Sequence, residues 1–149
     1  MDVEALLSSL DLDELTYEAS ALVAWQVGAA KNENDVAKFM YRHGPWPPQA
    51  STQREPPPDR RPDEKYWHFV KKEMRTFLCT DDKRYRDLWK QIDALQKKST
   101  TALVGVIAAF LGSSIGAPAT LIAGFVAVCL YAAIKLGKEA YCSYSGQGV

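Results

Sequence analysis

The chain has 149 residues, enough for one ordinary domain or for two small helical units joined by a linker. Eighteen basic and eighteen acidic residues give a formal charge of zero, so neither a strongly basic nor a strongly acidic partner is implied by the whole chain. The charges are unevenly distributed along the chain. Residues 1–44 hold eight acidic and three basic side chains, whereas residues 63–98 hold seven acidic and ten basic side chains. Residues 99–149 hold only three charged side chains. The basic segment predicts contact with the acidic N-terminal helices or with anionic lipid, while its interspersed aspartates argue against a nucleic-acid partner.

Residues 1–44 are predicted to form an acidic helical unit. Apolar residues recur at heptad spacing between Leu12 and Gln26, and Asp11 is placed to cap the helix that they form. A shorter helix is expected over residues 2–10. A third helix is expected to begin at Asn34 as N-cap and to end before Gly44 and Pro45. The acidic N-terminus lacks the basic start and apolar centre of a signal peptide, which predicts that the chain begins in the cytoplasm.

Residues 45–62 contain seven of the eight prolines and are predicted to be an extended linker. Residues 63–98 are then predicted to form a basic pair of amphipathic helices, the first capped by Asp63 and the second by Thr80. Their aromatic side chains have two interpretations. They form the core between the two helices, or Trp67 and Trp89 lie at the depth of lipid headgroups in an interfacial patch.

The three cysteines form no CxxC pair and are odd in number. They are Cys79, Cys129 and Cys142. We therefore expect no disulfide framework and a reducing compartment.

Residues 99–149 hold the most unusual segment, because residues 99–134 contain no charged side chain. The sequence GSSIGAP divides it into two helical arms, which predicts an apolar helical hairpin. Neither arm has a polar face, so each is expected to be buried all round. Each arm is roughly 25 Å long at 1.5 Å per residue. Both arms are therefore marginal spans for a hydrocarbon core of about 30 Å.

A membrane hairpin is favoured by the lysines that flank the run, since a two-pass hairpin places all of them on one side. These residues, expected at the membrane interface, are Lys97, Lys98, Lys135 and Lys138. Residues expected in the membrane are Leu103, Val106, Phe110, Leu121, Phe125 and Leu130. Residues expected to let the helices pack closely are Gly105, Ala109 and Gly124.

A soluble alternative is equally specific: amphipathic helices could sheathe the apolar hairpin inside a single globule. That architecture is similar to the one used by pore-forming colicins, with which this chain shares no motif.

Sequence motifs for catalysis, for metal ligands and for nucleotide binding are absent from the chain, and we expect no enzyme activity, no cofactor, no metal and no small-molecule substrate. The sequence as a whole predicts an all-α, membrane-associated protein on the cytoplasmic side of the inner or cell membrane. It would act as a membrane-perturbing or oligomerising effector, with its N-terminal unit docking on a protein partner. The alternative is a cytoplasmic helical adaptor or complex subunit whose apolar hairpin is a buried core.

Overall fold

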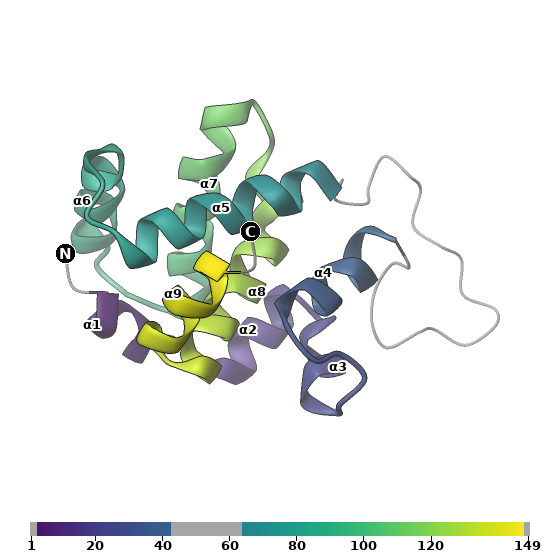
Figure 1. Cartoon of the computed structure of the whole chain (residues 1–149). Helices are drawn as coiled ribbons and strands as arrows, with labels where there is room; N and C mark the ends of the chain where they lie inside the picture. The colour runs from purple at the N-terminus through teal and green to yellow at the C-terminus, as the bar shows by residue number, and fades with distance from the viewer. Residues whose placement is uncertain (1–2, 43–63, 148–149) are drawn as a thin grey trace.

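The computed structural model describes residues 3–42 and 64–147, and every regular element in these two ranges is a helix (Figure 1). The all-α prediction is therefore confirmed. The predicted linker, residues 45–62, lies outside the described residues. In chain order the elements are α1 (Val3–Ser8), α2 (Leu12–Glu18), α3 (Leu22–Gln26), α4 (Glu33–Tyr41), α5 (Glu64–Cys79), the 3-10 turn η2 (Lys83–Tyr85), α6 (Arg86–Ala94), α7 (Thr100–Ile115), α8 (Ala119–Leu136) and α9 (Lys138–Gln147).

The centre of the fold is α8, which packs against α1, α2, α4, α5, α7 and α9. Figure 1 shows it passing through the middle of the molecule. Its first sixteen residues carry no charge, so burying them removes apolar surface from water without burying a charged side chain. Its buried residues are Ile122, Phe125, Val126, Ala127, Val128, Cys129, Leu130, Tyr131, Ala132 and Ala133.

The N-terminal helices differ from the prediction in two places. Asp11 caps α2 as expected, because its side chain accepts hydrogen bonds from the backbone N–H groups of Asp13 and Glu14. The predicted single helix from Leu12 to Gln26 is wrong, since the backbone is extended at Ala19 and the segment divides into α2 and α3. That break lies where α2 meets α8, with the Ala19 side chain next to Gly124.

The N-cap of α4 is Asn32 and not Asn34. The Asn32 side chain accepts a hydrogen bond from the backbone N–H of Asp35 at 3.0 Å. Asn34 is the second residue of α4, and its Oδ1 atom accepts from Trp67 Nε1 at 3.1 Å and from Lys71 Nζ at 3.2 Å. It therefore ties α4 to α5, a role that the local sequence does not indicate.

The basic helix pair forms as predicted, apart from the cap of its second helix, while Asp63, the predicted cap of the first, lies outside the described residues. The apolar face of α5 is buried at Trp67, Val70, Met74 and Phe77, as the helical spacing indicates. Asp82 replaces Thr80 as the cap, because its Oδ1 atom accepts the Arg84 backbone N–H at 2.9 Å. This hydrogen bond and the Arg84 guanidinium hold the pKa of Asp82 below its ordinary value.

The predicted apolar hairpin is formed by α7 and α8. Ser99 caps α7 by accepting the Ala102 backbone N–H at 3.1 Å, and Gly116 ends it in the left-handed conformation at φ +70°. The Ala117 N–H then donates to the Gly112 carbonyl at 3.0 Å. In Figure 1 the turn between the two helices stands clear of the rest of the molecule.

Candidate functional site

The most distinctive surface of the molecule is one side of α7. The residues of α7 that face the core are Leu103, Val104, Ile107, Ala108 and Leu111. The opposite side, which we call the α7 outer face, consists of exposed and half-buried residues: Thr101, Ala102, Gly105, Val106, Ala109, Phe110 and Ser113. None of these residues is charged.

The neighbouring helices have charged outer sides. The exposed residues of α5 include Lys65 and Lys72, and those of α6 include Arg86 and Lys90. The exposed residues of α2 include Asp13 and Glu14. Charged side chains on the solvent side are the usual pattern for a helix packed on a soluble core. The α7 outer face departs from this pattern over its whole length.

The six residues predicted to lie in a membrane divide into two sets. Leu103, Phe125 and Leu130 are fully buried in the protein core. Val106, Phe110 and Leu121 are half-buried and lie at the surface of the hairpin. In this folded state the first set is therefore surrounded by protein, and its contact with lipid stays a prediction.

Membrane-spanning capacity differs between the two arms. Within the part of the chain that the structure describes, α8 is the one helix long and apolar enough to cross a membrane, with 18 residues and a mean hydropathy of 2.0. It is 56% buried inside the fold, a property it shares with core helices of soluble proteins. The other arm, α7, is shorter, with 16 residues.

The three small residues predicted at helix contacts lie in different environments. A Cβ atom added to Gly124 would lie 2.6 Å from Met40 Cε, so this glycine does allow α8 to approach α4 closely. Gly105 has nothing within 4 Å of an added Cβ, and Ala109 is exposed. The expectation that these two mediate packing of the hairpin is not met within the chain, because the larger residues on the other side of α7 form its contact with the core.

Two glycines of α7 provide a matched test of this geometry. Gly105→Ala is expected to raise the free energy of unfolding by about 0.5–1 kcal/mol, because alanine favours helix and the site is open. Gly112→Ala is expected to lower it by about 1–3 kcal/mol, since the new Cβ would clash with the Ala117 carbonyl oxygen. Urea denaturation of both variants measures the difference. Equal effects would show that the turn is not packed as described.

Trp67 and Trp89, expected at a lipid interface, are core residues. They are 1% and 6% exposed. Trp67 packs on Phe125 with ring centroids 5.5 Å apart, and Trp89 packs on Phe77 at 4.9 Å. Both indoles lie on the apolar faces of their helices. Trp89 packs between α5 and α6, as the alternative interpretation expects, whereas Trp67 packs on α8.

The four flanking lysines lie at the base of the hairpin, where α7 begins and α8 ends. Lys97 is exposed, and Lys98 Nζ lies 3.4 Å from the Leu95 carbonyl oxygen at the end of α6. Lys135 is exposed, with its Nζ 5.5 Å from the centre of the Trp25 ring. Lys138 is half-buried. The hairpin therefore has a cationic base and an uncharged tip.

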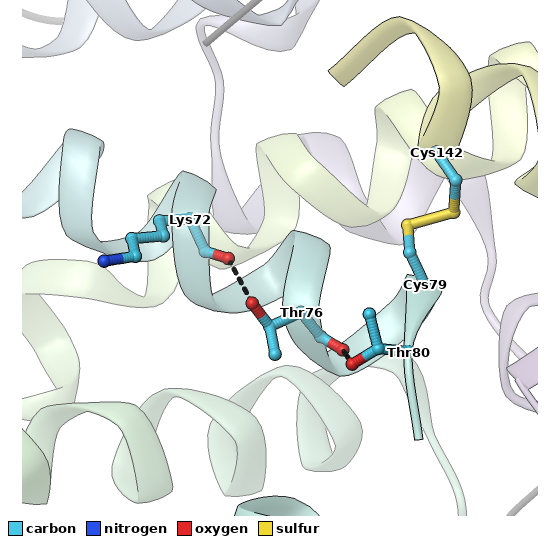
Figure 2. The surroundings of a disulfide bond; sticks show 5 residues. All are labelled: Lys72, Thr76, Cys79, Thr80 and Cys142. Carbon is cyan, nitrogen blue, oxygen red and sulfur yellow. Dashed lines mark hydrogen bonds between the residues drawn. A yellow bond between two sulfur atoms is a disulfide. The ribbon is translucent and has the colours of Figure 1, made fainter. Parts of the chain in front are cut away.

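A disulfide joins Cys79, at the end of α5, to Cys142 in α9 (Figure 2). The expectation that the cysteines form no disulfide is therefore wrong. Two cysteines 63 residues apart give no local signal, and only the return of α9 against α5 brings them together. Figure 2 also shows the end of α5, where the Thr76 hydroxyl donates to the Lys72 carbonyl at 3.1 Å and the Thr80 hydroxyl donates to the Thr76 carbonyl at 2.7 Å.

A polar cluster that sequence reasoning missed lies on the side of α8 covered by α4 and α9. The Cys129 thiol is fully buried, and burial raises its pKa. The nearby Glu33 carboxylate raises this pKa further, while the adjacent Tyr141 hydroxyl and the charge of Lys71 oppose the rise. Glu33 is 2% exposed, and its Oε2 atom has no hydrogen-bond partner among the described residues. The cluster holds Cys129 as an unreactive thiol for as long as it remains covered.

The described residues do not indicate a metal site. Within residues 3–42 and 64–147, no three His, Cys, Asp or Glu side chains are grouped so that they could hold a metal ion. His68 lies on the exposed side of α5, 3.2 Å from Glu64. His43 lies outside the described residues.

Comparison with known proteins adds no family to this description. No protein-family model, no curated protein and no solved structure matches the chain.

Proposed function

We propose that this protein is a non-enzymatic helical protein that associates with anionic membranes through the α7 outer face. The observation that carries the proposal is the absence of charge on this face, next to helices whose outer sides are charged. Water solvates a charged surface better than an apolar one. Moving the α7 outer face out of water is therefore more favourable in free energy than moving the charged outer sides of α2, α5 or α6. Its half-buried apolar side chains, Val106 and Phe110, supply most of the apolar area for that contact.

The cationic base of the hairpin supports an anionic lipid surface as the occupant. Lys97 and Lys98 are exposed immediately before α7. Each lysine near an anionic membrane contributes about 1 kcal/mol of attraction, which falls off within a Debye length. Binding is therefore expected to be weaker for neutral vesicles and weaker at high salt.

The packing of α8 supports a folded, sheathed form that precedes any insertion. In this form α8 is packed against six helices, and α7 offers an uncharged outer face along its described length. If the covering helices separate from it, α8 is long enough to cross a bilayer. The first contact with a membrane would then be made by α7, and insertion by α8 would follow.

The test is sedimentation of the full chain with vesicles of phosphatidylserine and phosphatidylcholine, using two matched variants. Ala109→Glu places a carboxylate on the α7 outer face, whereas Ala94→Glu makes the same change at an exposed position of α6. We expect Ala109→Glu to weaken binding at least tenfold, because its charge must be desolvated at an apolar contact, and Ala94→Glu to weaken it less than threefold. Equal effects of the two variants would remove the α7 outer face from the binding site. Absence of sedimentation by the unmodified protein would overturn the proposal.

A second candidate function, a soluble helical adaptor, is favoured by the complete burial of the central side chains of α8 without any membrane. In that case the α7 outer face would contact a protein, and a second copy of this chain is the simplest partner. The molar mass in solution, measured by light scattering over a range of concentrations, separates the two candidates. A dimer that Ala109→Glu dissociates, with no vesicle binding, would establish the second.

A further inference from the structure

We propose that the Cys79–Cys142 disulfide is a redox lock on α9, and that a dithiol reductant releases α9 from α8. This inference deepens the proposed function by naming its regulation, and its link to the membrane rests on that function.

The first argument is the limited burial of the described side chains of α9. Among residues 138–143, whose side chains the structure describes, Tyr141 alone is buried. Glu139 and Ala140 are exposed, and Lys138 is half-buried. Ordering these six residues costs backbone entropy at every position, and the burial of one tyrosine offsets part of it. Over these residues the disulfide adds a constraint that their side-chain packing does not supply.

The second argument is the place of the bond in the fold. Cys79 ends α5, a helix that covers α8, and Cys142 lies in the helix that follows α8. The covalent loop between them contains α6, α7 and α8. The bond therefore fastens the covering helix α5 to the base of the apolar hairpin, and α9 cannot leave while it is intact.

The third argument is what α9 covers. Tyr141 lies over Cys129 on α8, beside the buried Glu33 carboxylate whose Oε2 atom lacks a hydrogen-bond partner among the described residues. A buried carboxylate oxygen without a partner is unfavourable relative to one in water. Release of α9 would let water reach this oxygen, which in this one respect favours the released state over the closed one.

The chemistry of release is thiol–disulfide exchange. One thiolate of the dithiol attacks either cysteine sulfur, the S–S bond breaks, and the other cysteine leaves as a thiolate that takes up a proton. The second thiol of the reductant then attacks the mixed disulfide. The products are two cysteine thiols in the protein and a cyclic disulfide of the reductant, so two electrons pass to the protein. Cys79 and Cys142 are both half-buried at the surface, so a reductant can reach the bond.

Alkylation of Cys129 measures release directly. The oxidised protein has one free thiol among the described residues, and it is buried. The Cys79→Ser/Cys142→Ser double variant keeps this thiol and lacks the disulfide, so no reductant is needed. With a maleimide under native conditions, we expect Cys129 in the double variant to react at least tenfold faster than in the oxidised protein. Equal rates would overturn the proposal.

Hydrogen exchange of the same two proteins distinguishes release from general unfolding. We expect the amides of α9 to exchange by local opening in the double variant and to lose far more protection than those of α2 and α5, whose protection should fall only as much as the global free energy of unfolding falls. An equal loss of protection in α9, α2 and α5 would mean that the disulfide stabilises the entire fold and locks no separate element, which also overturns the proposal.

Vesicle sedimentation then separates this inference from the function on which it rests. The oxidised protein with and without dithiothreitol is mixed with the phosphatidylserine vesicles, and we expect reduction to increase the bound fraction at least threefold. Faster alkylation without vesicle binding in either redox state would uphold the lock on α9 and refute the membrane function. Equal binding in both redox states would uphold the membrane function and refute redox control of it.

Discussion

Removing the Cys79–Cys142 disulfide is expected to lower the free energy of unfolding by about 4 kcal/mol. The bond closes a loop across a sequence separation of 63 residues, and the chain-entropy relation gives a loss of this size for a loop of that length. For a chain of this size the melting temperature should fall by about 8–16 °C. Thermal unfolding of the Cys79→Ser variant, followed by circular dichroism beside the unmodified oxidised protein, measures it.

Reductant added to the unmodified protein is the control, because it should give the same shift without a substitution. Reductant should leave the melting temperature of the Cys79→Ser variant unchanged. A shift below about 2 °C in both comparisons would show that the two cysteines are not paired in the folded protein.

Phe125→Ala is expected to lower the free energy of unfolding by about 3–5 kcal/mol. Phe125 is fully buried at the centre of α8 and packs on Trp67, so its removal leaves a cavity that rigid helices cannot fill. Phe110→Ala is the matched variant, because it removes the same side chain from the half-buried α7 outer face.

Phe125→Ala should mainly lower stability, whereas Phe110→Ala should mainly weaken vesicle binding. Phe110→Ala is expected to cost less than half as much stability, since its ring is already partly exposed to water, and to weaken vesicle binding several-fold. Chemical denaturation and vesicle sedimentation measure the two effects. If Phe125→Ala costs no more stability than Phe110→Ala, α8 is not the centre of the fold.

The elements with a clear apolar stripe were predictable from sequence. The buried residues of α5 follow from helical spacing, and the α7–α8 hairpin follows from an uncharged run interrupted by Gly112, Gly116 and Pro118. These signals are local, because spacing along a helix and turn-forming residues lie close together in the chain.

The orientation of the hairpin was not predictable in the same way. When every residue of a helix is apolar or small, periodicity does not show which side meets the core. Gly105 and Gly124 therefore look equivalent in sequence, and only the packing shows that the first is open and the second faces Met40. The α7 outer face has no sequence signal beyond its lack of charge.

Contacts between distant segments account for the other differences. The pairing of Cys79 with Cys142, the burial of Glu33 against α8 and the hydrogen bond from Trp67 to Asn34 all join residues more than thirty positions apart or on different helices. No pattern within one helix carries this information. A buried carboxylate in particular looks like any acidic residue in the first turn of a helix, where it is favoured by the helix dipole.

The most direct test of the account is whether the α7 outer face leaves water when the protein meets an anionic membrane. In Ala109→Cys the new thiol is exposed, while Cys129 is protected in the oxidised protein, so an environment-sensitive fluorophore can be attached at position 109. The same fluorophore at Ala94→Cys is the control. On phosphatidylserine vesicles we expect a blue shift, and quenching by nitroxide-labelled lipid, at position 109 but not at position 94. A fluorophore at position 109 that stays in water while the protein is bound to vesicles would contradict the account.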